Sequence, residues 1–149
     1  MAHDVTNKQN DVAELLPMVD QTQANTGELP KEVSADYGYC SESNLNGLET
    51  RGVHGYVATG RQKHGQSSAA GERDVSRLPF TSAMRRRLRC GGFRSRYRLR
   101  KHVVEPVFGQ VKEARGFRGF LMRGLTKVRG EWSLISTAHN LQKLYKATV

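Results

Sequence analysis

The chain has 149 residues, of which 37% are hydrophobic, and this is enough for one domain with a modest core. No stretch approaches the roughly 20 apolar residues of a membrane helix, and the amino terminus lacks a signal-peptide pattern, so we expect a soluble intracellular protein. Cys40 and Cys90 are far apart in the sequence and lack metal-ligand spacing, so neither a zinc site nor a disulfide framework is indicated, and we expect reduced thiols.

The net charge of +10 is unevenly distributed along the chain. Residues 1–84 hold 7 Lys and Arg against 11 Asp and Glu, whereas residues 85–149 hold 17 against 3. Clustered cations bind a phosphate backbone by displacing its condensed counterions, so this excess favours a nucleic acid as the partner. A charged face that is merely solvated is the alternative.

Residues 10–27 are the first segment with helical periodicity. The predicted helix begins after a cap at Asn10 or Asp11 and ends near Gly27. Pro17 within it disfavours a continuous helix. The apolar side chains that repeat at helical spacing are Val12, Leu15, Leu16 and Val19.

Two short β-prone runs follow, with a helix between them. Residues 31–39 predict a first strand that leads into a turn, and residues 53–60 predict a second. Residues 41–52 predict a helix, because Ser41 suits its amino terminus and Gly52 its end. This order of helix, strand, helix and strand indicates a parallel α/β sheet with crossover helices.

Asp36 stands at the carboxyl end of the first predicted strand. Side chains at that edge of a parallel sheet face the crevice in which α/β proteins bind ligands. Residues 60–80 are poor in apolar side chains and rich in Gly and Ser, so we expect them to form a mobile loop.

From residue 81 onward the pattern is helical and basic. Residues 81–90 predict a short helix that a pair of glycines interrupts. Its run of Arg85, Arg86 and Arg87 is interpreted as a phosphate clamp, with a chance likeness to a nuclear-targeting signal as the alternative.

Residues 93–116 carry apolar side chains on one helical face and include Glu105 directly before Pro106. Proline lacks an N–H and crowds the preceding turn, so Pro106 is expected to break or kink a helix here. The Glu105 carboxylate lies among cations that include Lys101 and Lys112. On spacing alone, Glu105 could either form an ion pair or bind a metal ion. The apolar positions are Val104, Val107, Phe108 and Val111.

Residues 131–147 predict a terminal helix that packs on the core. Trp132 is assigned to that core rather than to a base-stacking surface, and the histidines lack metal-ligand spacing. The positions at helical spacing are Trp132, Ile135, His139 and Leu141 or Leu144.

Asp36 and Glu105 together suggest a metal site. Two carboxylates in one crevice, with cations around them, suit Mg²⁺-dependent phosphodiester chemistry, because hard cations prefer oxygen ligands. Asp and Glu are common in proteins, so the pair alone is a weak signal.

Three stretches carry a resemblance to a known family: ADYGYCSESNL at 35–45, YVATGRQKHG at 56–65, and residues 97–146, which contain VEPVFGQVK and RGEWSL followed by AHNLQKL. They resemble the C-terminal part of bacterial insertion-sequence transposases with a DDE catalytic domain, which has an RNase H-like fold. The similarity covers nearly the whole chain, and residues 66–80 match least.

The resemblance implies an α/β fold, namely an incomplete RNase H-like fold followed by a basic helical region. Residues 1–149 then form a partial DDE catalytic domain, with an α/β part at 1–59, a flexible loop at 60–80 and a basic helical part at 81–149. It also implies work on DNA in the bacterial cytoplasm, at the nucleoid, with no membrane involved.

The family's two Asp and one Glu bind two divalent metals, Mg²⁺ or Mn²⁺, that cleave and join DNA. Residue by residue, the second Asp matches Asp36 and the Glu matches Glu105, so the resemblance implies that both are catalytic metal ligands. The first Asp has no match in this sequence, because Asp4 and Asp11 stand at other places in the pattern. We therefore expect a truncated chain that is inactive alone and only partly ordered, with an open sheet edge and exposed apolar faces.

The family also carries a Tyr, a basic residue and a Lys around the Glu, which are proposed to contact DNA. Tyr97, Lys101 and Lys112 are the candidates here, with packing of Tyr97 and solvation of the lysines as alternatives. The further candidates for DNA contact are Arg61, Lys63, Arg85, Arg86 and Arg87.

The partners that the resemblance implies are the terminal repeats of an insertion sequence and a second copy of the chain or a full-length transposase. A second hypothesis makes the chain a DNA-binding or interaction module that acts through residues 85–129 without catalysis.

Overall fold

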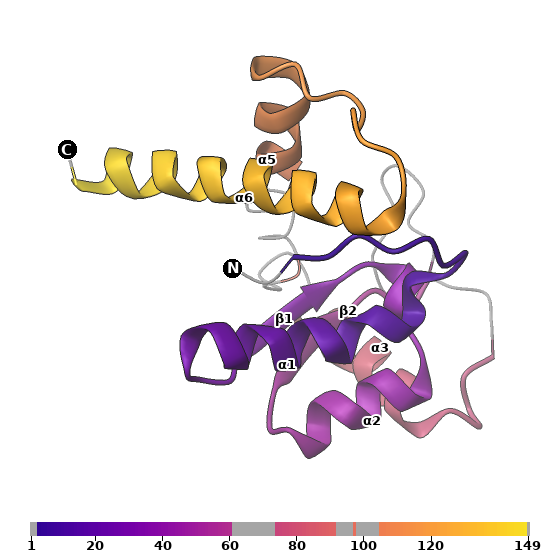
Figure 1. The fold of residues 1–149 in the computed structure, drawn as a ribbon. Coiled ribbons are helices and arrows are strands. Elements are labelled where there is room, and N and C mark those ends of the chain that lie inside the picture. Colours follow the sequence, from indigo (N-terminus) through magenta and orange to yellow (C-terminus); the bar gives the residue numbers. More distant parts are fainter. Residues whose placement is uncertain (1–2, 61–73, 92–96, 98–104, 149) are drawn as a thin grey trace. The chain divides into compact units, whose positions relative to one another are not determined.

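The computed structural model describes residues 3–60, 74–91, 97 and 105–148 (Figure 1). These residues form two compact units. Unit 1 is drawn from residues 10–102, and unit 2 combines His3–Gln9 with residues from 103–149. Most of the loop predicted at 60–80, and most of the predicted helical stretch before Glu105, lie outside the described residues.

Unit 1 confirms the predicted order of helix, strand, helix and strand. Its strands pair in parallel, with Ala35 opposite Val57, and the helix between them is the crossover. The fold is thus mixed α/β, as expected, with a two-stranded sheet. The elements are η1 (Asp11–Glu14), α1 (Leu15–Thr26), β1 (Glu32–Ala35), η2 (Tyr37–Tyr39), α2 (Glu42–Thr50), β2 (His54–Val57) and α3 (Pro79–Gly91).

The first helical segment begins and ends where its sequence allows. The side chain of Asn10 accepts a hydrogen bond from the Val12 amide at 2.9 Å and so caps η1. Pro17 lies in the first turn of α1, where a missing N–H costs nothing, and the helix is therefore not broken. Gly27 ends α1 with a φ of 81°, a left-handed conformation that glycine adopts without strain.

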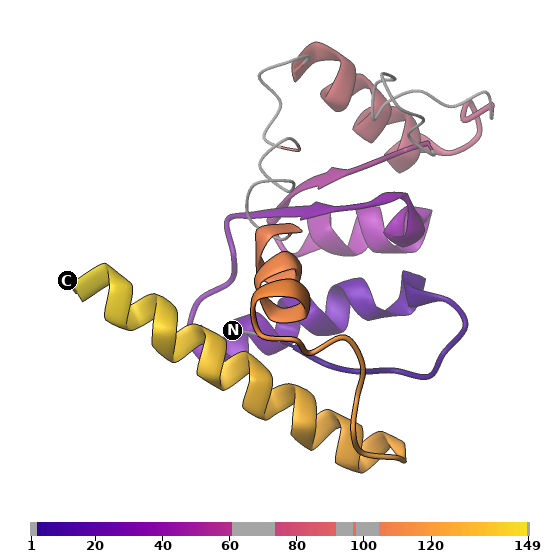
Figure 2. The ribbon, with the colours of Figure 1, turned by 90° about the horizontal axis from the view of Figure 1, so that it is seen from above.

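The core of unit 1 lies between the sheet and the helices. Figure 2 shows α2 between α1 and α3. A Cβ at Gly55 would lie 2.9 Å from Leu48 Cδ1 and 3.3 Å from Met84, so β2 approaches α2 and α3 closely only because this residue is glycine. The buried apolar residues are Leu15, Val19, Ala35, Leu45, Leu48, Val53, Val57, Ala58, Met84, Leu88 and Tyr97.

The edge of β2 that faces away from β1 is partly covered. The His54 amide donates to the Lys31 carbonyl on the β1 side, so the peptide groups of Gly55 point to the opposite edge. There the Gly55 carbonyl accepts a hydrogen bond of 3.1 Å from Arg87 Nη1 of α3. A charged side chain on a sheet edge hinders pairing with another strand, so the open edge that we expected is protected at this point.

Two polar residues of α2 connect the elements of unit 1. Buried Asn44 donates from Nδ2 to the carbonyl oxygens of Val12, at 2.6 Å, and Tyr39, at 2.9 Å. Glu42 accepts at its carboxylate from the amides of Phe80, at 3.1 Å, and Thr81, at 2.7 Å, and from the Thr81 hydroxyl at 2.6 Å. Glu42 thus satisfies amides in the first turn of α3 from a neighbouring helix.

Unit 2 contains α5 (Glu105–Gly109), the π-helical η5 (Gln110–Ala114) and α6 (Leu125–Thr148). Pro106 is the second residue of α5, and the chain stays helical beyond it as far as Ala114. The terminal helix is longer than the predicted 131–147, because it begins at Leu125.

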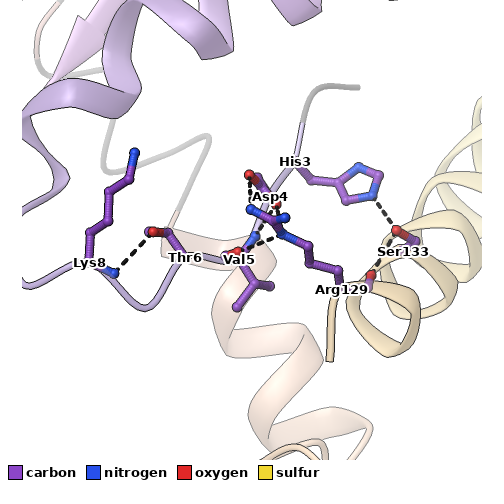
Figure 3. A network of polar contacts seen from close by, with 7 residues as sticks. All are labelled: His3, Asp4, Val5, Thr6, Lys8, Arg129 and Ser133. Carbon is purple, nitrogen blue, oxygen red and sulfur yellow. Dashed lines mark hydrogen bonds and ion pairs between the residues drawn. The ribbon is translucent and has the colours of Figure 1, made fainter. Parts of the chain in front are cut away.

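The segment His3–Gln9 is bound to α6 by polar contacts (Figure 3). Arg129 Nε lies 2.8 Å from Asp4 Oδ1 and donates to the Val5 carbonyl at 2.9 Å. His3 Nε2 lies 2.9 Å from Ser133 Oγ one turn along the helix. Asp4 therefore forms a structural ion pair with Arg129 in unit 2.

The core of unit 2 is small. Val111, Ile135 and His139 are buried, whereas Leu141 and Leu144 are 61% and 63% exposed. The prediction that Leu141 or Leu144 packs on the core is therefore wrong. Trp132 is half-buried between the rings of Phe108 and Phe120. Among the described residues, most of the exposed large apolar side chains belong to unit 2.

We predict that Glu42→Gln lowers the free energy of unfolding of unit 1 by about 1–2 kcal/mol, because an ionised acceptor of three hydrogen bonds becomes a neutral one. Partial burial raises the pKa of Glu42, but the hydrogen bonds from Thr81 and Phe80 outweigh this effect, and the net pKa lies below its ordinary value of 4.5. The ionised carboxylate therefore stabilises the fold above about pH 4.5, and this contribution is lost as the pH falls through the folded-state pKa.

Chemical denaturation at neutral and acid pH measures both effects. Glu49→Gln is the matched control, since Glu49 is exposed on the same helix. Equal stability of the Glu42 and Glu49 variants at neutral pH would contradict the assigned role.

Candidate functional site

Asp36 lies at the carboxyl end of β1, where the sequence places it. Its backbone is extended, and its Oδ1 accepts a hydrogen bond of 3.1 Å from the Gly38 amide, which caps η2. A Cβ at Gly38 would lie 3.2 Å from the same oxygen, so glycine leaves room for this conformation. The exposed carboxylate is thereby held in one direction at the edge of the sheet.

The surroundings of Asp36 are acidic. Burial raises the pKa of the Tyr39 hydroxyl, and the negative charges of Asp11, Asp36 and Glu14 raise it further. The carboxylates of Asp11, Glu14 and Asp36 thus act on the same phenol of unit 1.

The β2 side of the same edge holds a buried arginine. The Ala58 amide donates to the Ala35 carbonyl at 3.2 Å, so the chain beyond β2 runs alongside the chain that leads into Asp36. Arg85 is 8% exposed and makes long hydrogen bonds with Thr59, from Nε to Oγ1 at 3.5 Å and from Nη2 to the carbonyl at 3.4 Å. Its guanidinium therefore orders the carboxyl edge from inside unit 1.

The three consecutive arginines of α3 differ in their environments. Arg85 is buried, whereas Arg86 and Arg87 are exposed, although Arg87 also holds the Gly55 carbonyl. Tyr97 is buried in the core of unit 1, which is the packing alternative that the sequence left open. Arg61, Lys63 and Lys101 lie outside the residues that the structure describes.

Glu105 and Lys112 belong to unit 2. Glu105 is the first residue of α5, and Lys112 lies in η5. The exposed Lys112 places Nζ 5.8 Å from the centre of the Phe108 ring, a cation–π contact. A lysine held in this way still presents its charge to solvent.

No cluster of three or more His, Cys, Asp and Glu suited to a metal ion occurs among residues 3–60, 74–91, 97 and 105–148. Asp36 stands in unit 1 and Glu105 in unit 2. A hollow of about 310 Å³ in unit 1 is lined by Leu48, Gly55 and Met84 among others, and Asp36 is not part of it. The candidate residues are thus Asp36 at the end of β1, Glu105 as the first residue of α5, and cations in α3 and η5.

A protein-family model described as a transposase DDE domain matches residues 57–145, more than half of the chain. The chain belongs to this transposase family. No curated protein and no solved structure matched it. The matched residues include Glu105 and Lys112 but start after Asp36, so the assignment of Asp36 rests on the strand order and on its own motif.

The family match confirms the transposase resemblance. The described helices include none with the length and apolar composition of a membrane span. Sequence reasoning missed Glu42 and Glu131 as acceptors for backbone amides, because an acid that binds amides far along the chain leaves no local pattern.

His139 is the buried titratable group of the DDE domain's C-terminal helix. Its ring is 2% exposed, and neither of its nitrogens has a hydrogen-bond partner among the described residues. Burial lowers its pKa below the ordinary value of 6.5, and the charges of Arg115 and Lys143 lower it further. The folded chain therefore favours the neutral form of His139.

We predict that unit 2 loses stability as the pH falls below 6.5, because the unfolded chain then binds a proton that the folded chain excludes. Thermal melts between about pH 7.5 and about pH 5.5 measure this loss. The stability of His139→Leu should depend less on pH. His54 is exposed, so the control variant His54→Gln should keep the pH dependence of the wild type. A parallel pH response in the wild type and His139→Leu would refute the assignment.

Proposed function

We propose that this DDE transposase chain carries Asp36 and Glu105 as two of the carboxylate ligands of Mg²⁺ or Mn²⁺ with which its family cleaves and joins DNA, and that it is inactive alone because the family's first Asp has no match in this sequence. The family match, which includes Glu105, is the observation that carries the proposal. The position of Asp36 at the carboxyl edge of a parallel sheet supports it, because ligands of α/β proteins bind at that edge.

The chemistry of the two ligands fits a hard divalent cation. Carboxylate oxygens are the preferred ligands of Mg²⁺, and the hydrogen bond from Gly38 fixes the direction of the Asp36 carboxylate before a metal arrives. A bound pair of such ions supplies charge stabilisation to the attacking and leaving oxygens of a phosphodiester.

Exposed cations would hold the DNA backbone near these carboxylates. Arg86, Arg87 and Lys112 are exposed, and we propose that they contact DNA. Arg61, Lys63 and Lys101 are also proposed to contact DNA, on the evidence of the sequence. Arg85 and Tyr97 are buried, so we assign to them the ordering of unit 1. The proposed partners are the terminal repeats of an insertion sequence and a second copy of a transposase chain.

A second candidate function is DNA binding without catalysis. Residues 105–149 contain 8 Lys and Arg against 3 Glu, and this excess suits a phosphate backbone whether or not a metal binds.

For the catalytic proposal, we expect Mn²⁺ to bind in calorimetric titrations and Asp36→Asn or Glu105→Gln to weaken binding roughly tenfold or more, since even outer partners of a metal ligand contribute about that much. Glu28→Gln, at an exposed acid of unit 1, should leave the affinity unchanged. DNA nicking in Mg²⁺ by the chain alone, abolished in Glu105→Gln, would overturn the proposed inactivity and show that catalysis survives without the first Asp. Binding of DNA with neither Mn²⁺ affinity nor nicking would leave only the second candidate.

For both candidates, we expect DNA affinity to fall steeply between about 0.05 M and 0.2 M salt. Arg86→Gln and Lys112→Gln should each reduce the slope of log affinity against log salt by about 1, because each removes one phosphate contact. Arg51→Gln is the matched control, since Asp20 already neutralises Arg51 at 2.9 Å. Anisotropy of a labelled duplex gives the slopes, and an affinity that ignores salt would exclude both candidates.

A further inference from the structure

The connection between η5 and α6 exposes apolar side chains at its tip. It consists of residues 117–123, here called the tip loop, and it lies between Gly116 and Gly124, whose φ angles of 72° and 86° favour glycine. Leu121 is 87% exposed and Met122 is 54% exposed. Neither side chain contributes to the small core of unit 2, so stability does not explain their presence.

A carboxylate from α6 fixes the backbone of the tip loop. Glu131 accepts hydrogen bonds from the Leu121 amide at 2.9 Å and from the Met122 amide at 2.9 Å. Because both amides are bound on one side, the tip has a defined conformation while its side chains remain exposed. Charge-assisted bonds of this kind are stronger than those between neutral groups.

Aromatic rings lie at the base of the tip loop. The Phe120 ring meets Trp132 edge-on, with centroids 6.3 Å apart, and Trp132 stacks on Phe108 with centroids 6.1 Å apart. Phe108 and Phe120 are both exposed. The tip loop thus combines two projecting apolar side chains with an exposed aromatic surface that α5 and α6 hold in place.

The charges around the tip loop favour a polyanion over an apolar protein surface as its partner. Two of the three acids in residues 105–149 have local roles, since Glu113 pairs with Arg118 at 2.7 Å and Glu131 binds backbone amides. Arg123 lies within the loop, and it makes no ion pair among the residues that the structure describes. Exposed apolar and aromatic groups set among cations are typical of surfaces that bind unstacked bases.

We propose that the tip loop is a wedge for unpaired DNA, in which Leu121 and Met122 insert beside an unstacked base and Phe120 offers it a ring face. This inference rests on the proposed function, because it assumes that the chain binds DNA. It adds the structural state of the DNA that is bound: an end or junction whose bases have separated.

The test compares two labelled duplexes in EDTA, so that binding is measured without cleavage. One duplex is fully paired, and the other carries three mismatched pairs at one end. We expect the full chain to bind the frayed duplex roughly tenfold more tightly, since stacking of a base on a protein surface contributes about this much. A 2-aminopurine in the frayed end should change its fluorescence on binding.

The double variant Leu121→Ser, Met122→Ser should lose the preference for the frayed duplex and keep its affinity for the paired one. Leu141→Ser, Leu144→Ser is the matched control, since it removes two exposed leucines from α6 and should keep the preference. Glu131→Ala retains the apolar side chains but releases the backbone of the loop, and it should also reduce the preference. Far-UV circular dichroism checks that each variant is folded.

The outcomes separate this inference from the proposed function. Salt-dependent binding with equal affinity for the two duplexes would overturn the wedge and leave the proposed function intact, whereas no DNA binding would overturn both. A change in oligomeric state of the tip variant by size-exclusion chromatography, with the frayed-end preference retained, would make the loop a protein interface and would also overturn the wedge.

Discussion

The parallel pairing of β1 with β2 is the constraint on which the rest of unit 1 depends. Parallel strands require a crossover, and α2 provides it. The crossover places Glu42 where it caps α3, and the same register brings the chain beyond Val57 alongside the chain that leads into Asp36. The carboxylate at the sheet edge and the arginines of α3 are therefore positioned by one backbone arrangement.

The two units are stabilised in different ways. Unit 1 buries apolar side chains from its helices and both strands, and its polar residues connect helix ends. Unit 2 buries few apolar side chains and relies on polar contacts: Arg129 with Asp4, Arg115 with Gln142, and Glu131 with the tip loop. A unit held in this way leaves its hydrophobic groups on the surface, and surfaces of that kind commonly bind partners.

Basic residues of this transposase chain serve more than one purpose. Arg85 and Arg87 lie in one run of sequence, yet the first is buried against Thr59 and the second protects a sheet edge. Arg86 and Lys112 present their charges to solvent. A count of charges thus predicts the class of partner, because counterion release depends on total charge, but it does not say which cations are available for contact.

Local chemistry in the sequence determined the elements of unit 1: the cap at Asn10, the stop at Gly27, the cap at Ser41 and the position of Asp36 all depend on neighbours within a few residues. The family motif around Glu105 could also be recognised from the sequence, because its residues are contiguous. Tertiary structure alone decided that Leu141 and Leu144 are exposed, that Tyr97 is buried, and that Glu42 and Glu131 bind distant amides. Helical periodicity states which side chains share a face, but whether another element covers that face depends on contacts between residues far apart in the chain.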